Sequence, residues 1–141
     1  MNDQYDLQRF VDAQQTIYEN VREELRNGSK RSHWMWFIFP QVQGLGHSAM
    51  AQKFAISSLA EAQAYLQHPV LGARLRECSG LVAAVDGRSI EEILGFPDNM
   101  KFRSSMTLFA LAAPDDQVFK DCLHKYFGGE TDGSTLTQLG Q

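Results

Sequence analysis

The chain has 141 residues, 43% of them hydrophobic, and a formal net charge of -4 at pH 7. A chain of this length buries roughly two-thirds of its unfolded surface in one core, so we expect one domain over residues 1–141 that needs neither disulfides nor metals. The charge excludes proteins whose main task is to neutralise nucleic-acid backbone, and no apolar run approaches the ~20 residues of a membrane span.

The amino-terminal part begins with a strong helical pattern. From Asp6 onward, apolar residues recur every three or four positions, which predicts one long helix that ends near Asn27. Ser32 then caps a short predicted helix through Phe39, and Pro40 stops it. A buried strand is the alternative for this second segment, because its apolar residues show no alternation.

Turn residues and hydroxyl caps divide the middle of the chain. The glycines of residues 44–46 predict a tight turn, and a serine caps a short helix over residues 48–55. Residues 58–61 have the spacing of a capping box at the start of a helix that runs to Gln67.

The carboxyl-terminal half shows helical patterns throughout. A helix over 69–86 begins at its proline, and a second capping box opens a short helix over 89–95. Aspartates open the helices predicted over 98–113 and 114–126, and another caps a final turn over 132–139. These patterns predict a succession of helices.

No segment shows the period-two alternation of a half-buried strand, and no repeat or linker divides the chain. The predicted fold class is therefore all-α, a single compact multihelical domain of about six to eight helices. Cys78 and Cys122 stand at apolar helical positions and are interpreted as small buried hydrophobes in a reducing compartment. Residues 1–6 lack the parts of a secretory signal, so we expect a cytoplasmic protein.

The run from Lys30 to Gln41 is the first candidate site. It places Lys30, Ser32 and His33 at the start of a predicted helix, where free amides and the helix dipole favour a phosphate or carboxylate. We assign Lys30, Ser32 and Gln41 to ligand binding and His33 to catalysis by proton transfer. In the structural alternative, Ser32 only caps the helix and His33 lies at the surface.

Both tryptophans of the chain, Trp34 and Trp36, stand in this run. An exposed ring offers a π surface for a nucleobase or a sugar, so both are assigned to the wall of a ligand pocket. The alternative is that they belong to the core, since each large apolar side chain contributes roughly 1.5 to 3 kcal/mol when fully buried.

A second candidate site lies on the helix predicted over residues 98–113. Lys101, Ser104 and Ser105 share one face of it at spacings of three and four. Serines leave room for a ligand and donate hydrogen bonds, while the ammonium supplies charge. We assign Asp98 and Lys101 to catalysis and the two serines to ligand binding. The alternative is a close helix crossing that needs small residues, with Lys101 paired to Asp98.

Other polar residues give weaker signals. His47, His68 and His124 do not form a metal-ligand spacing with each other or with the cysteines, so we expect no metal site. Residues 44–47 are too short for a dinucleotide fingerprint because no strand precedes them, and we expect no cofactor. Gln14 interrupts an apolar helix face and either lines a polar pocket or bonds to a neighbouring helix.

Four segments together resemble a known family: residues 32–41, 44–46, 68–72 and 101–109. They resemble the bacterial domain of unknown function family 1810, and the resemblance spans nearly the whole chain. It implies an all-α fold, in agreement with the helical patterns, and it implies no named function.

A looser similarity is to the YbiA-like enzymes, which cleave N-glycosidic bonds of ribose-phosphate or ADP-ribose compounds. Residues 51–54, 101–102 and 135–136 follow the order of short motifs in those enzymes. Their motif has a glutamate seven residues before its lysine, where this chain has Gly46, so that acid is not carried over. The similarity implies that the carboxylate stabilising an oxocarbenium-like state comes from Asp98, Asp132 or Glu61.

The leading hypothesis is a domain that binds a phosphorylated or nucleotide-like small molecule in a pocket between helices, with N-glycosidic hydrolysis as the candidate reaction. The alternative is a non-enzymatic interaction module whose aromatic run is partly exposed as an apolar patch for another helix or a second copy of the chain. The expected partner is a small anionic ligand, with no nucleic acid and no membrane, and the alternative allows a homo-oligomer.

Overall fold

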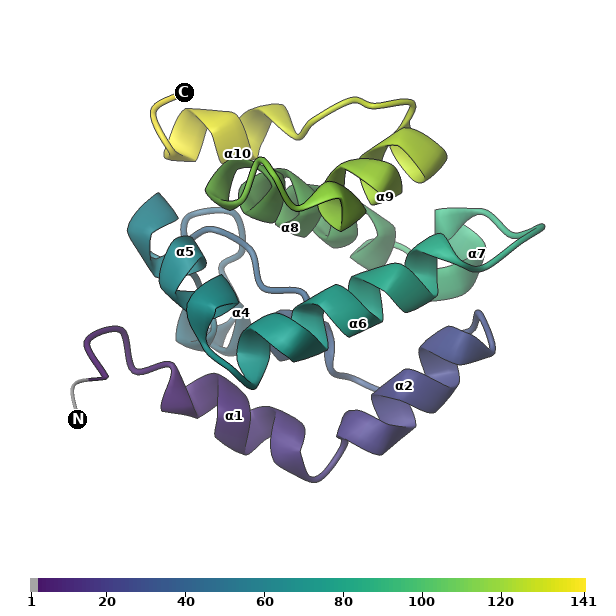
Figure 1. Cartoon of the computed structure of the whole chain (residues 1–141), viewed down its shortest axis with the longest axis horizontal. Helices are drawn as coiled ribbons and strands as arrows, with labels where there is room; N and C mark the ends of the chain where they lie inside the picture. Colours follow the sequence, from purple (N-terminus) through teal and green to yellow (C-terminus); the bar gives the residue numbers. More distant parts are fainter. Residues whose placement is uncertain (1–2) are drawn as a thin grey trace.

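The computed structural model describes residues 3–141, which form ten α-helices joined by short loops (Figure 1). An isolated parallel bridge joins Val42 to Ile56, and residues 3–141 contain no β-strand beyond this bridge. The predicted all-α fold is confirmed, with more helices than expected. The helices are α1 (Gln8–Gln15), α2 (Tyr18–Arg26), α3 (Met35–Ile38), α4 (Ala49–Lys53), α5 (Leu59–Gln67), α6 (Leu71–Ala83), α7 (Ile90–Leu94), α8 (Asp98–Ala112), α9 (Gln117–Phe127) and α10 (Gly133–Gln138).

The single long helix predicted from Asp6 to Asn27 is wrong, because the chain turns at Thr16 and Ile17 and forms α1 and α2 instead (Figure 1). The two helices have different packing partners: α1 packs against α3, and α2 packs against α6. Both turn residues are β-branched and have modest helix propensity, which makes a break there inexpensive.

Helix α8 lies at the centre of the fold and packs against α5, α7, α9 and α10 (Figure 1). Its aromatic rings meet rings from earlier in the chain: Phe102 lies 4.9 Å from Phe39, and Phe109 lies 5.4 Å from Tyr65, between ring centroids. Edge and tilted contacts of this kind add to the free energy of burial. Within residues 3–141 no helix is long and apolar enough to cross a membrane, and even α8 has only 15 residues.

The aromatic run forms α3 and the core beneath it. The strand alternative for this run is wrong, and the helix is shorter than predicted. Trp36 is half-buried, whereas its neighbours expose at most 8% of their surface. The run is therefore mainly core and does not form the exposed apolar patch that the interaction-module alternative requires. The buried neighbours are Trp34, Met35, Phe37, Ile38 and Phe39.

Several predicted caps are present. The Ser48 and Ser58 hydroxyls accept backbone hydrogen bonds at the starts of α4 and α5, and Asp132 does the same for α10. Ser89 and Glu92 form a complete capping box. Each of these signals is local, so the sequence alone determines where the helix begins.

Other predicted helix starts are displaced. Ser32 caps nothing, and α3 starts only at Met35. Asp98 is the first residue of α8 rather than its cap, because its carboxylate binds lysines. Helix α6 starts at Leu71 instead of Pro69, and α9 starts at Gln117.

Candidate functional site

The polar residues before α3 bind an anion that belongs to the chain itself. One carboxylate oxygen of Glu24, on α2, accepts hydrogen bonds from the Arg31 amide at 2.7 Å and the Ser32 amide at 3.0 Å. The other oxygen accepts a bond from the Ser32 hydroxyl at 2.7 Å. Both donors of Ser32 are thus satisfied within the chain, a placement that does not support the ligand-binding role predicted for it.

Glu24 also fixes Trp34, whose indole nitrogen donates to the carboxylate at 3.0 Å. Burial alone raises the pKa of the Glu24 carboxyl, but the hydrogen bonds that it accepts outweigh burial and hold this pKa below its ordinary value. The Trp34 ring is 1% exposed. This burial does not support its predicted stacking role and agrees with the alternative that it belongs to the core. His33 is exposed, and its side chain makes no hydrogen bond within residues 3–141.

Lys30, Asp98 and Lys101 form an ion cluster beside α3. The Lys30 ammonium lies 2.9 Å from one oxygen of Asp98, and Lys101 lies 3.7 Å from the other. The side chain of Lys30 is 9% exposed and that of Lys101 is 30% exposed. Two lysines face one aspartate, so the cluster carries an excess positive charge, and Lys101 is its more accessible member.

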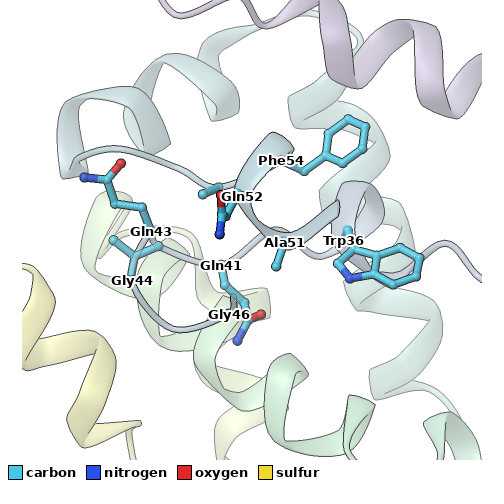
Figure 2. Close-up of a pocket in the computed structure, with 10 residues that line it drawn as sticks. Trp36, Gln41, Gln43, Gly44, Gly46, Ala51, Gln52 and Phe54 are labelled. Atoms are coloured by element: carbon cyan, nitrogen blue, oxygen red, sulfur yellow. The ribbon is translucent and has the colours of Figure 1, made fainter. Parts of the chain in front are cut away.

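Lys101 connects this cluster to a pocket, because its ammonium lies 5.6 Å from the centroid of the Trp36 ring. Trp36 forms part of the wall of a pocket of about 140 Å³, which Gln41 and residues of α4 also line (Figure 2). The contact with Lys101 is a cation–π interaction. The structure thus brings together five of the predicted site residues: Lys30, Trp36, Gln41, Asp98 and Lys101.

The loop after α3 forms the floor of this pocket and is held by backbone hydrogen bonds. Ile56 donates to the carbonyl of Gln41 and accepts from the amide of Gln43, both at 2.9 Å. Gly44 has φ +94°, a conformation that residues with a side chain rarely adopt. At Gly46 a Cβ atom would lie 2.6 Å from the Cβ of Ala51, so only glycine lets the loop approach α4 this closely.

Three glutamines supply the polar groups of the pocket: Gln41, Gln43 and Gln52. The Gln52 amide nitrogen donates to the carbonyl of His47 at 2.9 Å, which leaves its oxygen as an acceptor. Within residues 3–141, the side chains of Gln41 and Gln43 make no hydrogen bond. Of the three, only Gln41 was predicted as a site residue. Gln43 lies on a loop without a motif, and Gln52 lies in the 51–54 segment that is similar to the YbiA-like enzymes, where it was given no role.

Ser104 and Ser105 do not line this pocket. The Ser104 hydroxyl donates to Asp132 at 3.0 Å, so it connects α8 to the start of α10. Ser105 is fully buried, and its hydroxyl has no partner within residues 3–141. The ligand-binding role predicted for the serines is not supported by their placement, and the alternative of small residues at a helix contact describes them better.

The remaining polar candidates have structural surroundings. The Gln14 amide donates to the carbonyl of Phe37 at 2.7 Å and to the hydroxyl of Tyr65 at 3.1 Å, so Gln14 joins helices rather than lining a pocket. Cys78 and Cys122 are buried, and burial raises the pKa of each thiol to about 12. Such thiols stay protonated near neutral pH and are poor nucleophiles.

Comparisons with known proteins agree on one family. The model of the family described as "Protein of unknown function (DUF1810)" matches residues 4–139. The chain is similar to the conserved hypothetical protein Rv1873 from Mycobacterium tuberculosis, whose crystal structure it matches at 58% identity with a TM-score of 0.97 over 99% of each chain. No protein of curated function matches significantly. The chain therefore belongs to the DUF1810 family.

Proposed function

We propose that the protein binds a small phosphorylated or nucleotide-like molecule at the Trp36–Gln41 pocket. The observation that carries the proposal is the position of Lys101, whose ammonium lies 5.6 Å from the ring centroid of Trp36 in the pocket wall. A cation next to a concave site with an aromatic wall and unpaired amides is a common arrangement for ligands that combine a ring and an anion.

The charges of the ion cluster support an anionic ligand. Asp98 lies closer to Lys30 than to Lys101, at 2.9 Å against 3.7 Å, and Lys30 is the more buried of the two lysines. An incoming phosphate would therefore find Lys101 only weakly neutralised by Asp98. The Lys101 side chain is also the more exposed of the two, at 30% against 9%, so an anion can reach its ammonium directly and Lys101 is the expected anchor.

Hydrolysis of an N-glycosidic bond stays a prediction for the same site. Of the three carboxylates considered for it, Asp98 alone adjoins Lys101. Glu61 is 2% exposed and holds Arg9 at 3.1 Å, while Asp132 accepts bonds from Ser104 and Thr135. Asp98 is thus the carboxylate of the three that adjoins the proposed phosphate anchor, although its two lysine neighbours offset its charge. Release of free base from a bound nucleotide is the measurement that tests turnover.

Thermal unfolding with a panel of nucleotides, sugar phosphates and simple anions tests the binding proposal. A ligand at about 100 times its dissociation constant adds roughly 2.7 kcal/mol, which raises the midpoint by several degrees. We expect the shift to disappear in Lys101→Ala and to persist in Lys120→Ala, a lysine on α9 whose ammonium binds the carbonyl of Pro114. A panel without any shift, or an equal shift in Lys101→Ala, contradicts the proposal.

A further inference from the structure

The pocket beside Trp36 has an uncharged lining. None of its ten lining residues, all within residues 3–141, carries an ionisable side chain. Charge is available at its edges, where the Lys101 ammonium lies 5.6 Å from the centroid of the Trp36 ring and the Lys53 ammonium lies 5.3 Å from that of the Phe54 ring. Lys101 belongs to the ion cluster with excess positive charge, so we take its edge as the anion side. A ligand that uses both features must be divided in the same way, with a neutral part inside the pocket and an anionic part outside.

The size of the pocket limits the neutral part. Its volume is about 140 Å³. An engineered cavity of roughly 150 Å³ in another protein accommodates benzene, so this pocket has room for one six-membered ring. A fused two-ring base would have to leave part of its surface outside.

The polar groups of the pocket indicate the chemistry of that ring. A glutamine amide offers both donors and an acceptor. The Gln41 amide has no hydrogen-bond partner within residues 3–141, and Gln52 retains a free oxygen because its nitrogen is bound to His47. Both residues line the pocket, one from the loop after α3 and one from α4, so donor and acceptor groups are available to a neutral ring (Figure 2). The edge of a pyrimidine base, with a carbonyl beside a ring N–H or amino group, matches this pattern.

Resting on the binding function proposed above, we infer that the pocket takes the base of a pyrimidine nucleotide, with the phosphate outside against Lys101. Trp36 provides the apolar wall for the planar ring, and the free Gln41 amide pairs with its polar edge. A sugar phosphate without a base would contact only Lys101, and a nucleoside without a phosphate would occupy only the pocket.

Tryptophan fluorescence measures this preference directly, because Trp36 lies in the pocket wall whereas Trp34 is buried and bound to Glu24. We would titrate the protein with UMP, uridine, ribose 5-phosphate, inorganic phosphate and AMP. We expect UMP to bind at least about tenfold more tightly than each of the others, a difference that corresponds to one net hydrogen bond or ion contact.

Variants separate the base from the phosphate. We expect Gln41→Ala to weaken UMP about tenfold and to leave the affinity for ribose 5-phosphate unchanged. Gln15→Ala, an exposed glutamine on α1, serves as the matched control and should bind UMP normally. If ribose 5-phosphate or AMP binds as tightly as UMP, or if Gln41→Ala has no effect, the inference is overturned while the proposed function stands. If no phosphate-bearing probe binds, both are overturned.

Discussion

The carboxylate of Glu24 lies 3.0 Å from the indole nitrogen of Trp34. The same carboxylate accepts hydrogen bonds from the backbone amides of Arg31 and Ser32. One side chain of α2 therefore holds both the loop before α3 and the indole of Trp34. Successive backbone N–H groups form a concave anion site of the kind that also binds phosphate. The sequence indicated an anion at this place, and the anion proves to be internal.

Removal of the Glu24 carboxylate should destabilise the fold. In Glu24→Ala the indole N–H of Trp34 and two amides lose their acceptor, and we expect the free energy of unfolding in urea to fall by about 1 to 3 kcal/mol. Glu23→Ala replaces the exposed neighbouring glutamate and should change it by less than about 0.5 kcal/mol. Equal losses in the two variants would show that the hydrogen bonds of Glu24 contribute nothing.

The contribution of Glu24 should depend on pH. Its pKa is lowered in the folded protein, so its stabilising effect is fully present above the ordinary value of 4.5 and is lost as the pH falls through the folded value. We expect the difference in unfolding free energy between the natural protein and Glu24→Gln to shrink from about pH 6 to about pH 3. Comparison with the variant cancels the effect of other carboxylates, and a difference that is constant with pH contradicts this assignment.

The two tryptophans should respond differently to truncation. Trp34 is 1% exposed, and Trp34→Ala should lower the free energy of unfolding by about 3 to 5 kcal/mol, as expected for a large core side chain. Trp36 is half-buried at the pocket, so Trp36→Ala should cost clearly less and keep the protein folded at room temperature. Urea unfolding of both variants measures the difference. A larger loss for Trp36 would mean that its ring carries core packing instead.

Local signals explain which parts of the fold the sequence predicts. The capping box of Ser89 and Glu92 needs only residues three apart, and it is present as predicted. The break at Thr16 and Ile17 has no such signal. It exists because α1 and α2 pack on helices that lie far along the chain, and the apolar spacing continues through it.

The same distinction applies to the site. The pairing of Lys101 with Asp98 follows from their spacing of three on one helix, and it is predictable from the sequence as one of two alternatives. The contact between Lys30 and Asp98 joins distant segments, and the bond from Ser32 to Glu24 spans eight residues across the turn after α2. Only packing brings these groups together, so residue type and spacing alone cannot separate an external anion from an internal one.

The cap of α10 gives a further prediction. One oxygen of Asp132 accepts bonds from the Ser104 hydroxyl at 3.0 Å and the Thr135 hydroxyl at 2.6 Å, which joins α10 to α8. We expect Asp132→Ala to cost about 1 to 2 kcal/mol and to speed amide hydrogen exchange in α10. Asp115→Ala, which replaces an exposed aspartate before α9, should change neither the free energy of unfolding nor the hydrogen exchange of α10. Unchanged hydrogen exchange in Asp132→Ala would mean that contacts other than those of Asp132 hold α10 against α8.

Helix α6 begins with two amides held by one histidine ring. The Nδ1 atom of His68 accepts hydrogen bonds from the amides of Val70 and Leu71, each at 3.2 Å. His68→Ala removes this acceptor and should lower the free energy of unfolding by about 1 kcal/mol, as the loss of a helix cap does. Chemical unfolding of both this variant and His47→Ala measures the effect, since His47 is exposed and its side chain makes no hydrogen bond within residues 3–141.

A second substitution at the same position separates the hydrogen bonds of His68 from its packing. In His68→Asp a carboxylate oxygen reaches the amides two and three residues ahead, as aspartate does at helix starts, and it also favours the positive end of the helix dipole. We therefore expect His68→Asp to recover most of the stability lost in His68→Ala. If both variants are equally destabilised, the packing of the imidazole ring, rather than its nitrogen, holds the start of α6.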